Sequence, residues 1–254
     1  IESSKPLCDL NNLFSLADDF AVIKDPVLSD MYQSLIRPLA KYRFQIDELD
    51  TLSYAALLER ASNTDDLNHQ MQYLLAAYQK APENEEILFL LGKTLFEARQ
   101  FAEAIAVFQK IKNNCAVSNF IAVAHAEQGA PEKGLEILED AIAKLPQEEN
   151  YRIQLLRILR DTMNNYPKAL EKGWEAIKAC PNSIDIAVEV AETHRHYSLW
   201  IKSDLESKNA SIVEIQEGMK TQWEHMANLY ARCRALEPEN GTWFHHYGTC
   251  CLNL

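Results

Sequence analysis

The sequence predicts an all-α solenoid, in which pairs of antiparallel helices follow one another along the chain. Three observations support this fold class. Apolar residues recur at helical spacing between regularly placed prolines. At four places a proline follows a small residue by five positions, and these places divide the chain into units of about 34 residues. Glycine is scarce, with 7 in the chain, whereas a protein of many short strands needs many turns.

The clearest unit covers residues 85–110 and reads EEILFLLGKTLFEARQFAEAIAVFQK. Small residues stand at Gly92 and Ala104, 12 positions apart, and Phe108 follows 4 positions later. Small residues let two antiparallel helices approach closely, and large apolar residues fill the space around the contact. This pattern resembles the tetratricopeptide repeat, with its large residue, Leu-Gly, large apolar residue, Ala and Phe. The resemblance implies a right-handed superhelical array of helix pairs.

The proline-marked endings set the boundaries of the units. Proline cannot continue a helix, so each one ends a second helix and begins the next turn. The endings are Ala77 with Pro82, Ala141 with Pro146, Ala176 with Pro181, and Cys233 with Pro238. The sequence therefore predicts about five repeats and an incomplete sixth, at 51–84, 85–114, 115–149, 150–183, 184–240 and from Gly241 onward.

The beginning of the chain does not match the repeat. We expect residues 1–50 to form a helical cap on a repeat array that covers residues 51–254, because such arrays need a terminal unit with a polar outer face. The chain starts with Ile1 instead of Met, which predicts a processed or cut chain.

The fifth unit is about 23 residues longer than one period. Apolar residues from Ile212 to Cys233 recur every three or four positions, as on one face of a long helix. We therefore expect an extended helix pair over about 184–240, with a loop near 203–210. Its extra length either packs on its own partner helix or docks a partner or a second subunit.

The last residues resemble the first helix of a sixth repeat. Trp243, Phe244 and Tyr247 give this helix an apolar face, and its second helix is missing before Leu254. An apolar face without a partner helix is an exposed patch. We expect the natural chain to continue, or this end to contact a second subunit or a further domain.

Composition narrows the range of partners. The formal net charge is -12, and an acidic surface repels phosphate backbones, so we expect no nucleic-acid partner. No stretch of 18 apolar residues occurs, so we expect no membrane span. The six cysteines are far apart except for Cys250 and Cys251, which favours a reducing compartment, and we expect the cytoplasm.

Signals of enzyme chemistry are weak in this sequence. The loops GxGxxG, GxxxxGK[ST] and GxSxG do not occur, which argues against a nucleotide enzyme or an α/β-hydrolase. Zinc needs four ligands, usually from two separate segments, and the group of His245, His246, Cys250 and Cys251 has no second pair nearby. We therefore expect no catalytic residues, no metal and no cofactor.

The resemblance also implies a binding site. In tetratricopeptide proteins the first helices of successive repeats line a concave groove that holds the ligand. Some members clamp a C-terminal carboxylate, but Ala55 and Glu59 stand at the matching places, so that clamp is incomplete here. The aromatic groove residues would anchor apolar side chains, and the polar ones would hold a peptide backbone or a carboxylate. The expected groove residues are Phe89, Lys93, Phe96, Asn119, Tyr151, Gln154, Arg195 and His196.

The sequence thus predicts a non-catalytic scaffold or adaptor that binds a protein or peptide in the groove of the array. The alternative is a substrate-presenting module of a larger enzyme, for example a glycosyltransferase, which continues beyond the C-terminal end. A likeness of fold alone does not decide between them.

Overall fold

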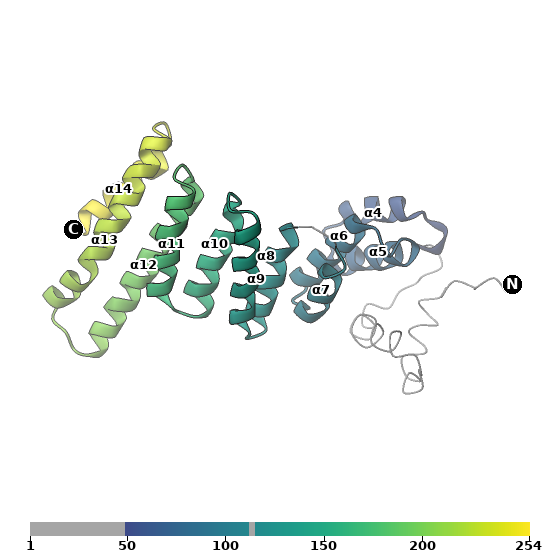
Figure 1. Ribbon diagram of the computed structural model, residues 1–254, viewed down its shortest axis with the longest axis horizontal. Helices are drawn as coiled ribbons and strands as arrows, with labels where there is room; N and C mark the ends of the chain where they lie inside the picture. Colours follow the sequence, from purple (N-terminus) through teal and green to yellow (C-terminus); the bar gives the residue numbers. More distant parts are fainter. Residues whose placement is uncertain (1–48, 112–114) are drawn as a thin grey trace. The chain divides into compact units, whose positions relative to one another are not determined.

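The computed structural model describes residues 49–111 and 115–254, and every regular element in those ranges is helical (Figure 1). The cap expected over residues 1–50 lies outside the described residues, except for the short 3-10 helix η4 (Leu49–Thr51). None of the described helices combines the length and the apolar character that crossing a membrane requires. The described residues fall into two compact units, divided between Ala124 and His125, which are described separately below.

In the described part of the first unit, helices pack as antiparallel pairs. Helix α4 packs on α5, and α6 packs on α7. The bounds are α4 (Tyr54–Ser62), α5 (Leu67–Lys80), α6 (Glu85–Glu97), α7 (Phe101–Phe108) and α8 (Cys115–Glu127), the last of which crosses the boundary between the units.

The second unit continues the same pattern of helix pairs. Helix α10 passes directly into a π-helical turn, η5, before the chain turns back into α11. Helices α12 and α13 pack on each other along much of their length, and α14 packs on α13. The bounds are α9 (Pro131–Lys144), α10 (Glu149–Arg157), η5 (Ile158–Thr162), α11 (Tyr166–Ala179), α12 (Ile184–Ser207), α13 (Ile212–Leu236) and α14 (Gly241–Leu252).

The prolines end the second helices through a shared geometry. The residue before each of them caps the preceding helix with ψ between 71° and 76°, outside the α-helical region that a following proline disfavours. The N–H of that cap residue donates to the carbonyl of the small residue four positions earlier, and the proline has no N–H with which to continue. The cap and acceptor pairs are Ala81 with Ala77, Leu145 with Ala141, Cys180 with Ala176, and Glu237 with Cys233.

Small residues let neighbouring helices come into close contact. A Cβ atom on Gly92 would lie 2.6 Å from Cε1 of Phe108, so the ring of α7 rests directly on the backbone of α6. The same closeness occurs in the second unit, where a Cβ on Gly173 of α11 would lie 2.7 Å from Cγ2 of Val190 on α12. The packing role expected for Gly92 is therefore present in the fold.

The fifth pair is longer than the others, with 24 residues in α12 and 25 in α13 (Figure 1). Its connection lies at residues 208–211, whereas the sequence suggested a loop near 203–210. Along the end of α12, Lys202 and Glu206 pair one turn apart, and Ser211 with Glu214 forms a capping box that starts α13.

Near its tip the long pair packs mainly on itself. A Cβ on Gly218 of α13 would lie 2.9 Å from Cδ1 of Leu205 on α12, so the two helices are in direct contact there. The apolar stripe expected from Ile212 onward is buried only in its later part, beginning with Met226, and Ile212 itself is 75% exposed.

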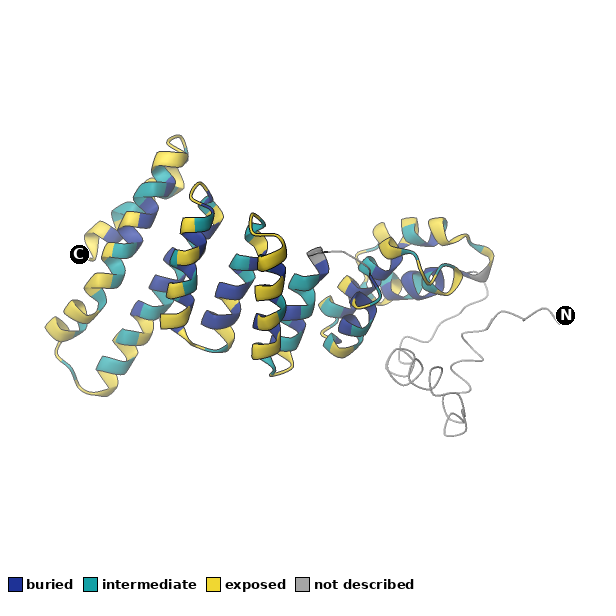
Figure 2. Ribbon diagram, in the orientation of Figure 1, coloured by how far each residue is buried: buried dark blue, intermediate teal, exposed yellow. Residues whose placement is uncertain are grey.

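Each unit has its own apolar interior, and buried residues follow the sides of helices that face other helices (Figure 2). In the first unit the core gathers around Phe108 and Leu91, with a smaller cluster around Leu57. In the second unit it gathers around Val190 and Tyr230. The polar surface described next lies on helices that this second core holds in place.

Candidate functional site

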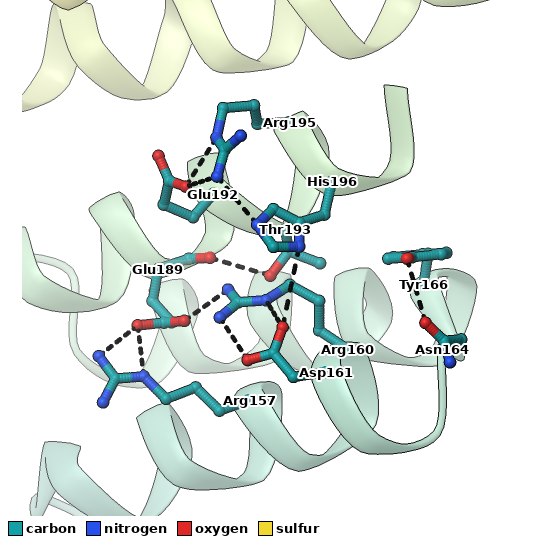
Figure 3. A network of polar contacts seen from close by, with 10 residues as sticks. All are labelled: Arg157, Arg160, Asp161, Asn164, Tyr166, Glu189, Glu192, Thr193, Arg195 and His196. Carbon is teal, nitrogen blue, oxygen red and sulfur yellow. Dashed lines mark hydrogen bonds and ion pairs between the residues drawn. The ribbon is translucent and has the colours of Figure 1, made fainter. Parts of the chain in front are cut away.

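A buried ion pair joins the first helices of two successive repeats in the second unit. Nη1 of Arg160 on η5 lies 2.5 Å from Oε1 of Glu189 on α12, and both side chains are less than one-tenth exposed (Figure 3). The other carboxylate oxygen of Glu189 accepts from Arg157, with Nε at 2.9 Å and Nη2 at 2.8 Å. One buried carboxylate is therefore held by two guanidinium groups.

The network continues from Arg160 toward the surface (Figure 3). Nε and Nη2 of Arg160 donate to the two carboxylate oxygens of Asp161, at 2.6 Å and 2.8 Å. Oδ1 of Asp161 lies 3.8 Å from Nδ1 of His196, and Nε2 of His196 lies 2.9 Å from Nη2 of Arg195. Since arginine can only donate, Nε2 of His196 accepts, and Nδ1 carries the proton of the neutral ring. Arg195 in turn pairs with Glu192.

The π-helical turn explains why these side chains meet. A π-turn adds a residue to the helical turn, and such turns are frequent at functional sites. Here it follows α10 directly, so Arg157 and Arg160 both reach Glu189 on the neighbouring helix while Asp161 stays half exposed. On α12, the Thr193 hydroxyl donates to the carbonyl of Glu189, one turn earlier.

Burial and charge shift the proton affinities of this network in opposite directions. Burial acts to lower the pKa of Arg160, but its hydrogen bonds with Asp161 and the charges of Glu189 and Asp161 outweigh that effect and raise the pKa. Burial lowers the pKa of His196, and the positive charges of Arg160 and Arg195 lower it further. The arginine therefore stays charged and the histidine neutral near pH 7.

The surface of this network is polar and charge-balanced. We call the surface formed by α10, η5 and α12 the first-helix face. Its network holds three arginines and three carboxylates, of which Arg157, Asp161 and Arg195 are about half exposed. Guanidinium groups fixed by carboxylates keep some donors directed outward, and such groups suit bidentate recognition of carboxylates and peptide carbonyls.

An aromatic cluster adjoins the network along α12. The rings of Tyr166 on α11 and Tyr197 on α12 stack with centroids 5.5 Å apart, and Tyr197 stacks on Trp200 at 5.8 Å. The Tyr166 hydroxyl lies 3.4 Å from Oδ1 of Asn164 (Figure 3). Trp200 remains 48% exposed, so this cluster presents a large ring to solvent.

In the first unit, the expected groove residues divide into two groups. The rings of Phe89 and Phe96 lie 6.0 Å and 5.4 Å from Phe120, so both help to close the contact between α6 and α8 and are only partly exposed. Lys93 is exposed and pairs with Glu97 at 3.7 Å. Oδ1 of Asn119 is buried without a hydrogen-bond partner among the described residues.

In the second unit, the expected groove residues differ most at Tyr151. This side chain is 1% exposed and is one of the largest fully buried side chains, so it fills the interior instead of lining an open surface. It lies near the start of α10, among the buried residues of that helix. Gln154 is partly exposed on the same helix, and Arg195 and His196 both belong to the network on the first-helix face.

The aromatic residues at the C-terminal end belong to α14, which packs on α13. Trp243 and Tyr247 pack against the core of the second unit, and Nε1 of Trp243 donates to Glu237 at 2.7 Å. The guanidinium of Arg234 lies over the rings of Phe244 and Tyr247, 4.9 Å and 4.8 Å from their centroids. Phe244 is 51% exposed, so it contributes most to the remaining apolar surface of this group.

Several network residues were not expected from the sequence. Arg157, Arg160, Asp161 and Glu189 belong to it, although none was proposed as a groove residue. The spacing of Arg157 and Arg160, three apart near the end of a first helix, was a usable signal because such residues share a helix face. The π-turn that adds Asp161 has no comparable signal in the sequence.

A metal site finds no support in the part of the chain that the structure describes. Within residues 49–111 and 115–254, no group of three or more His, Cys, Asp or Glu side chains is placed to hold a metal ion. Cys250 is buried in the core of the second unit while Cys251 is exposed, so the two thiols of that pair lie in different environments.

Comparisons with known proteins bear on the fold. No family model matches the sequence, and no curated protein matches it. A solved structure of MamA from Desulfovibrio magneticus RS-1 is similar over 75% of this chain and 98% of its own, with 16% identity and a TM-score of 0.51. A thermophilic TPR protein of Thermus thermophilus is similar over 79% of this chain and 100% of its own, with 14% identity and a TM-score of 0.49.

A further solved structure is the human IFIT1 dimer with m7Gppp-AAAA. It is similar over 96% of this chain and 55% of its own, with 13% identity and a TM-score of 0.47. At such identities the likenesses concern the fold alone. With its proline-capped helix pairs packed closely at Gly92 and Gly173, the chain has the tetratricopeptide repeat fold.

Proposed function

We propose that the chain is a non-catalytic scaffold that binds a protein segment on the first-helix face of its second unit. The observation that carries the proposal is the network in which half-exposed Arg157, Asp161 and Arg195 surround the buried Arg160–Glu189 pair. Burying the charges of Arg160 and Glu189 costs desolvation energy that can exceed their mutual attraction. Stability alone therefore does not account for this network.

The network suits binding because it is already ordered. Immobilising a long side chain costs about 0.5–1.5 kcal/mol when it happens on binding. Arg157 is held by Glu189 and Arg195 by Glu192 before any partner arrives, so much of this cost has been met in folding. Each guanidinium can then donate its remaining N–H groups to a peptide carbonyl or carboxylate.

The first unit would contribute a second, weaker contact region. The exposed Lys93 and the buried amide oxygen of Asn119 lie on first helices of their own repeats. A buried amide oxygen without a partner costs about 1–3 kcal/mol. The exposed ammonium of Lys93 is the group that a segment bound along these helices would reach, because Oδ1 of Asn119 has no exposed surface.

The test is a comparative affinity purification with the full chain. The variant Arg157→Ala with Arg195→Ala removes two exposed guanidinium groups but leaves the buried Arg160–Glu189 pair. The matched control, Lys178→Ala with Lys220→Ala, removes two exposed charges from other surfaces of the same unit. We expect quantitative mass spectrometry to find a partner that wild type and control capture and that the arginine variant loses. Equal capture by all three would place the binding surface elsewhere.

A further inference from the structure

We propose that the aromatic cluster of Tyr166, Tyr197 and Trp200 accepts the cationic side chain of an arginine or lysine in the bound protein segment. This inference rests on the proposed function and adds the chemistry of one contact. Trp200 offers the largest π-surface of the cluster, and cations bind best to the face of tryptophan.

The geometry of the cluster holds the indole ready for such a contact. Tyr197 and Trp200 are stacked with an interplanar angle of 27°, and Tyr166 and Tyr197 with one of 18°. Tyr166 also lies 6.3 Å from Trp200, so the three rings support one another. Trp200 is nevertheless 48% exposed, and its exposed surface is fixed in direction before a ligand arrives.

The chain's own cations already occupy comparable rings. Arg234 lies over Phe244 and Tyr247, and Lys110 lies 5.2 Å from the ring centroid of Tyr78. Within the described residues, no arginine or lysine is recorded over Trp200.

The two lysines nearest to Trp200 in sequence are engaged elsewhere. Lys202 pairs with Glu206 at 3.8 Å, and Lys208 pairs with Asp204 at 2.6 Å. Both pairs run along α12 at a spacing of four residues, which favours such contacts on a helix surface. The exposed indole is therefore left for a cation from outside the chain.

The charge of the second unit favours a basic segment. Residues 125–254 contain 20 acidic and 14 basic side chains, and the whole chain has a formal net charge of -12. An acidic surface attracts a positively charged partner and repels a phosphate backbone. These charges favour a basic protein segment over a nucleic acid whose bases would stack on the same ring.

The cluster lies within reach of the charged network. His196, which contacts Asp161, and Trp200 are four positions apart on α12 and so share a helix face. Four residues of helix span about 6 Å, which is about two residues of an extended peptide. The bound segment would therefore place its cation about two positions from the residue that meets Asp161 and His196.

The test starts from random peptides of about twelve residues displayed on phage and selected on the full chain. We expect the selected sequences to be enriched in arginine or lysine. In a synthetic selected peptide, replacing that arginine by citrulline, which keeps the shape and removes the charge, should weaken binding about three- to thirtyfold. Replacing a lysine by norleucine should act similarly.

Variants of the chain identify the ring. Trp200→Ala should weaken binding of the same peptide about three- to thirtyfold, and Trp200→Phe should retain more of it. The matched control is Phe244→Ala, because Phe244 is 51% exposed on the same unit and already has Arg234 over its ring. This control should bind as wild type does.

Four results would overturn the inference. Selected peptides without basic residues would exclude the cation, as would unchanged affinity of the citrulline peptide. Binding of a single-stranded oligonucleotide that depends on Trp200, without peptide binding, would assign the ring to base stacking instead. A peptide whose binding depends on Arg157 and Arg195 but is unchanged in Trp200→Ala would leave the proposed function intact and exclude only this contact.

Discussion

Arg160 and Glu189 form an ion pair of 2.5 Å between η5 and α12, with both side chains less than one-tenth exposed. The pair joins the first helices of two successive repeats and supports the half-exposed charges around it. Its burial makes the two residues strongly dependent on each other, because a buried charge without its partner is costly. This dependence can be measured, as can the strength of other contacts in the fold.

The first prediction concerns the buried pair itself. Glu189→Leu leaves Arg160 without its buried partner and should lower the free energy of unfolding by about 3–5 kcal/mol. The double variant Arg160→Met with Glu189→Leu removes both charges and should recover most of that loss. Chemical denaturation of the three proteins measures both effects. If Glu189→Leu were as stable as wild type, Arg160 would not depend on Glu189 as its partner.

The second prediction tests close packing at glycine. Gly173→Ala places a methyl group 2.7 Å from Cγ2 of Val190, whose β-branched side chain has little freedom to move. Gly248→Ala is the matched control, since nothing lies within 4 Å of its added Cβ. Both changes gain the same helix propensity, so Gly173→Ala should be less stable than the control by about 1–3 kcal/mol. Equal melting temperatures would argue against the contact.

The third prediction is a dependence of stability on pH. His194 is buried, stacks on His225 at 4.8 Å and contacts Gln222 through Nδ1 at 2.7 Å. Burial lowers the pKa of His194 to about 4, from 6.5, despite the hydrogen bond with Gln222. The folded protein therefore keeps His194 neutral while the unfolded chain binds a proton below pH 6.5.

The sign of the effect follows from this difference in pKa. Stability is unaffected by His194 above its unfolded pKa and falls as pH drops from there toward the folded value. Between about pH 7 and about pH 5 the loss should be about 2 kcal/mol, at about 1.36 kcal/mol per pH unit below the unfolded pKa. Urea denaturation should show this loss in wild type and a much smaller one in His194→Phe. Equal losses in both proteins would assign the acid sensitivity to other groups.

The fourth prediction compares two helix caps. The Ser183 hydroxyl accepts from the N–H of Ile186 at the start of α12 and donates to Oε2 of Glu149 at 2.5 Å, so it links two repeats. Ser183→Ala should cost about 1–2 kcal/mol, near the upper end for a helix cap. Ser53→Ala removes an exposed cap of α4 with one contact of 3.3 Å and should cost less. Thermal unfolding measures the loss of stability in both variants. A larger loss for Ser53→Ala than for Ser183→Ala would contradict the prediction.

The sequence was most informative where local rules determine the structure. The spacing of Ala141 and Pro146 predicted the end of α9, because the proline acts on the residue before it wherever it stands. The small residue at Gly92 likewise predicted a close helix contact, which Phe108 provides. These features depend on neighbours in the chain or on one partner at a fixed spacing.

The functional surface was less predictable, because it depends on which way side chains face. Tyr151 was expected to line the groove, but its side chain lies in the core. Glu189 is buried where Arg157 and Arg160 meet it from another helix, next to a π-turn. Periodicity in the sequence does not report such long-range pairing.

Hydrogen exchange on the full chain, with and without the partner obtained by affinity purification, tests whether that partner binds on the first-helix face. Binding on the first-helix face predicts slower exchange at residues 157–162 and 192–200. Helix α9, which contributes no residue to that face, should exchange as in the unbound chain. Protection confined to α9 or α14, with no change in the two predicted segments, would show that the partner binds on another surface.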